Sequence, residues 1–165
     1  MLPALAQLGR GDDADRALGV ALTELEADPV GTAPGRFGFD EPELALHQAE
    51  AHLVLGRAEQ ARARAEASAD ACSGGTPGWA AATLVLAQTE AVVRPDDAAQ
   101  RAVDVLDRIP AARLRSTART RLARLDALLP DRTISGVADL HERLRVLPAV
   151  IDDHGQAITS AMAPR

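Results

Sequence analysis

The chain has 165 residues, of which 47% are hydrophobic and only 2% aromatic, with no tyrosine, one cysteine and a net charge of −6. Alanine dominates the apolar residues, and because alanine favours helices whereas strands prefer β-branched and aromatic residues, the composition predicts an all-α fold. All 18 basic residues are arginine, which excludes chemistry that depends on a lysine amine. The single cysteine excludes an internal disulfide and fits a reducing compartment.

The charge is unevenly distributed along the chain. Residues 1–110 carry 18 acidic residues and 9 arginines, a net charge of −9, whereas residues 111–165 carry 6 and 9, a net charge of +3. A mostly negative chain argues against nucleic-acid binding, which depends on neutralising phosphates. The first residues lack the basic start and apolar core of a signal peptide, and no apolar run approaches the roughly 20 residues that span a bilayer. We therefore expect a soluble, cytoplasmic protein.

The sequence pattern of residues 1–28 indicates the second half of a degenerate helix pair. Residues 2–8 resemble the end of a helix, and a second helix begins at an Asp12 or Asp13 cap. Its apolar residues recur at helical spacing and form one stripe, which predicts an amphipathic helix: Ala14, Ala17, Leu18, Ala21, Leu22 and Leu25. A first helix that leaves apolar surface exposed would allow self-association through this half-repeat. The Gly/Pro-rich residues 29–39 predict a loop.

Two helix pairs follow, each of which is joined by a tight turn. The first covers residues 40–72; it begins at Asp40 as a side-chain cap and turns at Gly56. The second covers residues 76–108 and begins with Thr76 as the cap. We expect these two pairs to form the centre of the domain.

The C-terminal region, residues 110–147, predicts two more helices. Pro110 opens a long helix that ends near Leu129, and a last helix covers about 134–147. Residues 148–165 have weak periodicity and are expected to fray. Together the segments predict one helical repeat domain over residues 1–147, with seven or eight helices.

At Leu55-Gly56-Arg57-Ala58-Glu59-Gln60-Ala61 the sequence resembles the tetratricopeptide repeat. That family has a small residue midway along its first helix, a glycine at the turn and an alanine five residues later, a pattern that Ala49, Gly56 and Ala61 match. Ala87, Arg94 and Ala99 repeat the spacing, with arginine in place of the glycine. The resemblance implies helical hairpins stacked in a right-handed superhelix.

A larger resemblance covers most of the chain. Phe37 to Leu44, the Leu-Gly-Arg turn, the helix around Trp79, the arginine-rich helix and Leu140 to Leu144 occur in a familiar order. This order is similar to the C-terminal repeat region of actinobacterial helix-turn-helix regulators of the XRE family. The resemblance implies a sensing or oligomerising region, while a separate N-terminal domain binds DNA. We expect no direct nucleic-acid binding from this chain. The alternative is a free-standing adaptor protein with no role in transcription.

The tetratricopeptide resemblance also implies a concave groove lined by the first helix of each pair. Such a groove would be mostly apolar with a few polar contacts, which suits a peptide, a protein segment or a small amphipathic ligand. The register carried over from the family gives these candidates: Glu43, Leu46, His47, Glu50, Leu53, Val54, Ala81, Leu84, Gln88, Ala91 and Val92.

A second candidate surface is basic. Five arginines flank the leucine stripe of the helix predicted after Pro110: Arg113, Arg115, Arg119, Arg121 and Arg124. Arginines in this position usually cover a packed seam with their aliphatic stems. The functional alternative is a docking surface for an acidic partner or for a DNA backbone.

Other candidate sites are better explained structurally. Glu43, His47 and Glu50 share one helical face, which is a candidate metal or acid–base cluster, but ordinary Glu–His pairing accounts for it. Gly74 to Gly78 lacks the Gly-Lys-Ser/Thr ending of a phosphate loop and predicts a helix-capping turn. Cys72 lies on a stripe of small residues, and this position predicts that its thiol is buried and unreactive. We therefore expect no metal, no cofactor and no enzymatic activity.

Overall fold

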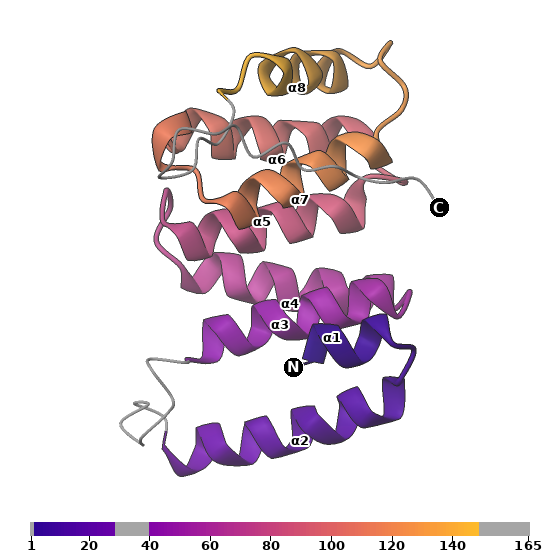
Figure 1. The fold of residues 1–165 in the computed structure, drawn as a ribbon, viewed down its shortest axis with the longest axis vertical. Helices are drawn as coiled ribbons and strands as arrows, with labels where there is room; N and C mark the ends of the chain where they lie inside the picture. The colour runs from indigo at the N-terminus through magenta and orange to yellow at the C-terminus, as the bar shows by residue number, and fades with distance from the viewer. Residues whose placement is uncertain (1, 29–39, 149–165) are drawn as a thin grey trace, which may run out of the picture.

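The computed structural model describes residues 2–28 and 40–148, and these residues form helices without any strand (Figure 1). The all-α prediction is therefore confirmed for this part of the chain. The predicted loop over residues 29–39 and the predicted tail beyond Pro148 lie outside it. The elements are α1 (Leu2–Gln7), α2 (Gly11–Ala27), α3 (Glu41–Val54), α4 (Ala58–Ala71), α5 (Pro77–Glu90), α6 (Pro95–Arg108), the 3-10 turn η1 (Ala111–Arg113), α7 (Ser116–Leu128) and α8 (Ser135–Arg145).

The two predicted side-chain caps of the central pairs are present. Asp40 Oδ1 accepts the backbone N–H of Glu43 at 3.0 Å and starts α3, and Thr76 Oγ1 accepts the N–H of Trp79 at 3.3 Å and starts α5. Each bond satisfies a donor that has no partner inside the helix. The cap predicted at Asp12 or Asp13 is wrong, because α2 begins at Gly11 and both aspartates lie within its first turn.

The long helix predicted from Pro110 to Leu129 is interrupted. A short 3-10 turn, η1, is followed by extended backbone at Leu114 and Arg115 before α7 begins at Ser116. The Arg119 guanidinium donates to the carbonyl oxygens of Ala111 at 2.8 Å and Leu114 at 3.4 Å, which supplies partners for carbonyls near the break. The break also places the Leu114 side chain in the core.

Helices α3, α4, α5 and α6 form a consecutive antiparallel series in which each helix packs against the next (Figure 1). Helix α7 leaves this series, because it packs against α5, whereas α8 packs against α6. Helix α3 also contacts α5, so that α3, α5 and α7 lie along one side. At the other end α1 packs against α3, and α2 packs mainly against α1.

The largest core cluster lies among α5, α6, α7 and α8. Its fully buried members include Leu84, Val105, Leu122, Leu125 and Leu140. A smaller cluster joins α1 to α3, with α2 covering it through half-buried side chains. Ala14 is the one buried residue that α2 contributes, so the N-terminal end of the domain is held by less apolar contact than the centre.

A buried carboxylate links the second helix pair to the first. Glu90, at the end of α5, is 2% exposed. Its carboxylate oxygens accept hydrogen bonds from the Arg94 guanidinium at 2.7 Å and from the Arg101 guanidinium at 2.6 and 3.3 Å. The Nε atom of Arg62 lies 3.9 Å from Glu90 Oε1. A buried charge is tolerated only when it is paired and hydrogen-bonded, so these three arginines hold α4, α5 and α6 in one relative position.

Replacing Glu90 with alanine should lower the free energy of unfolding by roughly 2–3 kcal/mol, because the change removes buried charge-assisted hydrogen bonds from Arg94 and Arg101. The matched control is Glu66→Ala, which removes a half-exposed partner of Arg62 and should cost less than about 1 kcal/mol. Urea denaturation followed by circular dichroism measures both. Equal effects of the two changes would show that the Glu90 cluster is not a structural link.

Gly56 occupies the turn between α3 and α4 with φ of 71°. A side chain there would meet open space, so Gly56→Ala should destabilise by about 1 kcal/mol through backbone strain alone. Gly19 lies inside α2, where an added Cβ also meets nothing, and Gly19→Ala should stabilise by about 0.5–1 kcal/mol. Thermal unfolding tests the pair, and effects of the same sign would contradict this account of the turn.

Candidate functional site

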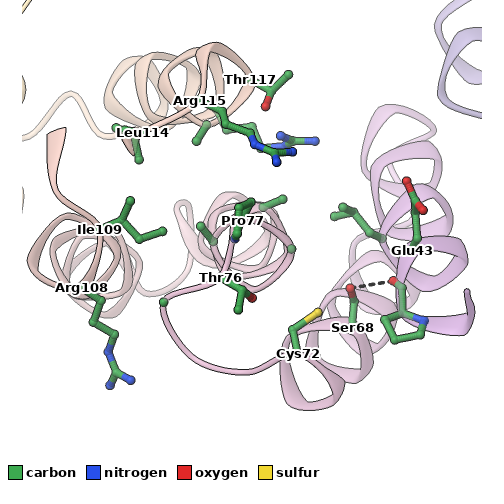
Figure 2. A pocket seen from close by; sticks show the side chains of 18 of the residues that line it. Glu43, Ser68, Cys72, Thr76, Pro77, Arg108, Ile109, Leu114, Arg115 and Thr117 are labelled. Carbon is green, nitrogen blue, oxygen red and sulfur yellow. Dashed lines mark hydrogen bonds between the residues drawn. The ribbon is translucent and has the colours of Figure 1, made fainter. Parts of the chain in front are cut away.

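A cleft of about 740 Å³ opens at one edge of the helical series. It lies where the first turns of α3, α5 and α7 meet the last residues of α4 and α6, and Figure 2 shows it from close by. Five helices and η1 therefore supply its lining. This volume is within the range of ligand-binding pockets.

The two walls of the cleft carry opposite charges. Asp40 and Glu43 belong to the start of α3, and Arg113 and Arg115 belong to η1 and the break that follows it. In Figure 2 Arg115 extends over the first turn of α5, where Pro77 lies, while Glu43 projects from α3. The helix break is what brings both arginines to the cleft.

The floor of the cleft is mostly apolar and includes Leu46, Ala81 and Leu114. Its backbone is closely packed, because a Cβ added at Gly78 would lie 3.2 Å from Cys72 Sγ. On the α4 side, the Ser68 hydroxyl donates to the Pro42 carbonyl oxygen at 2.8 Å (Figure 2). These contacts fix α4 against the first turns of α3 and α5.

Cys72 lines the cleft and is half-buried. Burial raises the pKa of the Cys72 thiol, and the negative charge of Asp40 raises it further. The thiol is therefore protonated at neutral pH, and since the thiolate is the nucleophilic form, Cys72 is a weak nucleophile there.

An ion pair beside the cleft joins α7 to α3. Arg121 Nη2 lies 2.5 Å from Glu50 Oε1, and His47 Nδ1 lies 3.5 Å from Glu50 Oε2. The side-chain amide of Gln88 on α5 donates to the Arg121 carbonyl oxygen at 3.2 Å. Burial alone would raise the pKa of Glu50, but the hydrogen bond from His47 and the charge of Arg121 outweigh it and lower that pKa.

The predicted groove residues separate into several groups. Four of them line the cleft: Glu43, Leu46, His47 and Ala81. Glu50 is not part of the lining, but it forms an ion pair with Arg121, which is. Val54, the last residue of α3, and Val92, in the turn after α5, are exposed at the helix ends away from the cleft, and Leu53 packs against a buried cluster.

The prediction that Leu84, Gln88 and Ala91 line an accessible groove is wrong. Leu84 is 0% exposed and Ala91 3% exposed, and the Gln88 side chain is used by the bond to Arg121. The physical reason is that α7 packs along α5 and covers the face on which these residues lie. The accessible part of the predicted groove is therefore its N-terminal end.

The five predicted arginines do not form one surface. Arg113, Arg115 and Arg121 line the cleft, so that part of the basic surface and part of the predicted groove are the same site. Arg119 instead serves the fold, since it donates to the carbonyl oxygens near the break and to that of Pro148 at 2.6 Å. Arg124 is exposed outside the cleft.

Sequence reasoning missed the contribution of the α4–α5 connection to this site. Thr76, Pro77 and Gly78 were expected only to start a helix, which they do, but they also line the cleft. The local pattern contains no indication of this second role, because it depends on α7 lying nearby. Within residues 2–28 and 40–148, no group of three or more His, Cys, Asp or Glu side chains could hold a metal ion.

Comparisons with known protein families, curated proteins and solved structures give no significant match to this chain. Among the described helices, none combines the length and the apolar character required to cross a bilayer. The functional interpretation therefore depends on the geometry and charge of the cleft.

Replacing Glu50 with glutamine should lower the free energy of unfolding at neutral pH by roughly 1.5–3 kcal/mol, because a half-buried charged hydrogen bond is lost. The folded-state pKa of Glu50 is below the ordinary value of 4.5, so its stabilisation is complete above that value and is lost as pH falls through the folded pKa. The difference between wild type and Glu50→Gln should therefore shrink in acid.

The control for this prediction is Glu142→Gln, which removes an exposed ion pair with Arg145 and should cost less than about 1 kcal/mol at neutral pH. Urea denaturation at a series of pH values measures both variants. A Glu50→Gln deficit that stays constant into strong acid would contradict the assigned role of the ion pair.

Proposed function

We propose that the chain is a non-enzymatic tetratricopeptide-like interaction domain that binds a peptide or protein segment in the cleft. The observation that carries the proposal is the cleft itself, a volume of about 740 Å³ with an apolar floor and charged walls. Pockets that combine apolar lining with a few placed polar groups are the usual sites of ligand recognition.

The tetratricopeptide part of the proposal is supported by the central helices. Helices α3 and α4 form one antiparallel pair, α5 and α6 form the next, and α4 packs against α5 between them. Gly56 adopts a positive φ at the first turn, as expected where a helix ends at a glycine. We include the right-handed superhelical stacking of residues 40–72 and 76–108 in the proposal.

We further propose, on the sequence resemblance to XRE-family regulators, that this domain senses a ligand for a transcriptional regulator. The alternative is a free-standing adaptor that binds other proteins without any role in transcription. An in-frame helix-turn-helix segment encoded upstream of Met1 would favour the regulator. Binding of a protein partner unrelated to transcription through the cleft would favour the adaptor.

A bulky side chain placed in the cleft should block binding. Thr117 lines the cleft on the first turn of α7 and is exposed, so Thr117→Trp should weaken a bound peptide by about tenfold or more without disturbing the core. Thr120 is exposed on the same helix outside the cleft, which makes Thr120→Trp the matched control. The measurement is the affinity of both variants for peptides selected on an array with the wild-type chain. Equal affinity of the two variants would place binding elsewhere.

A further inference from the structure

The charges that face the cleft are of two kinds. Some are already neutralised within the domain: Arg121 is paired with Glu50 at 2.5 Å, and Arg108 is paired with Asp104 at 2.9 Å. The second kind has no ion-pair partner within residues 2–28 and 40–148, and it comprises Arg113, Arg115, Asp40 and Glu43. These four side chains are exposed and hold the charge that a bound ligand would meet.

The unpaired charges lie on opposite walls. Arg113 and Arg115 stand on the side of η1 and α7, and Glu43 stands on α3 together with Asp40, whose Oδ1 is used by the helix cap. Helix α5 contacts both α3 and α7, and its buried Ala81 belongs to the apolar lining of the cleft. Charge-assisted hydrogen bonds to arginine are among the stronger polar contacts, and they strengthen where apolar surface excludes water.

We propose that the cleft selects a peptide segment that carries both an acidic and a basic side chain. The acidic side chain contacts Arg113 and Arg115, and the basic side chain contacts Glu43. A uniformly acidic segment is repelled by Glu43 and Asp40, and a uniformly basic one is repelled by the arginines, so each wall excludes one class of competitor. This inference rests on the proposed function, because it assigns the ligand chemistry of the same cleft.

Cys72 provides a direct readout of occupancy. It is the single cysteine of the chain, and it lines the cleft. The rate at which a thiol reagent modifies the 165-residue chain therefore falls when a peptide covers this part of the surface. Because no other thiol is present, the measured rate belongs to Cys72 alone.

The experiment compares four synthetic peptides of one neutral background: a mixed-charge peptide, an acid-only peptide, a base-only peptide and an uncharged peptide. In the mixed-charge peptide the two charged residues are three positions apart, roughly 10 Å in an extended chain, and both orders are tested. We expect the mixed-charge peptide to protect Cys72 at concentrations about tenfold lower than the other three peptides require. Added salt should reduce this advantage.

Variants assign each wall to one charge. In the double variant Arg113→Gln, Arg115→Gln the mixed-charge peptide should protect no better than the base-only peptide, and in Glu43→Gln no better than the acid-only peptide. Arg124→Gln, an exposed arginine outside the cleft, is the control and should change nothing. Glu43→Arg should transfer the preference to the acid-only peptide, a gain of binding that a misfolded variant would not give.

The outcomes separate the two proposals. If the acid-only peptide protects the wild-type chain as well as the mixed-charge peptide, the α3 wall has no role and the inference is wrong. If all four peptides protect equally, the cleft binds peptides without regard to charge, so the proposed function stands and the inference falls. If none protects Cys72 at any concentration, both are overturned.

Discussion

The architecture depends on the need to cover α5 on every side. Ten of its fourteen residues are buried, and no face of the helix is polar enough to lie against water. Helices α3, α4, α6 and α7 all pack against it. The chain leaves α6 at Ile109, and after η1 and the extended residues Leu114 and Arg115 it forms α7, which packs against α5. The cleft is the place where this covering stops, at the first turn of α5.

The polar residues of such a helix need partners from its neighbours, since an unpaired polar group in the core costs free energy. Gln88 is paired with a backbone carbonyl of α7, and Glu90 with arginines that come from α4, α6 and the turn before α6. A hydrogen bond requires its donor and acceptor at defined positions, whereas apolar contact can be made in many relative positions of two helices. The polar side chains of α5 thus determine which surfaces of the neighbouring helices face it, and through Arg121 they also fix one wall of the cleft.

The sequence was sufficient for features with local causes. The helical composition, the caps at Asp40 and Thr76 and the glycine turn at Gly56 all act within a few residues, and the structure has them where they were expected. The path of α7 has a non-local cause, so neither the break at Leu114 nor the merging of the groove with the arginine surface was predicted. Leu84 illustrates the difference, because helical periodicity places it on a face of α5 and says nothing about which element covers that face. The nearly unbroken apolar stretch from Ala80 to Ala87 was the one available indication that α5 is enclosed.

The residues that hold the unpaired charges of the cleft lie at helix ends and outside every hydrophobic cluster of the described chain. Substitutions at exposed positions of this kind usually change stability little. Arg113, Arg115 and Glu43 can therefore be exchanged during evolution without loss of the fold, whereas α5 cannot. A gene duplication would give two copies with the same scaffold that are free to diverge in the charges that their clefts present.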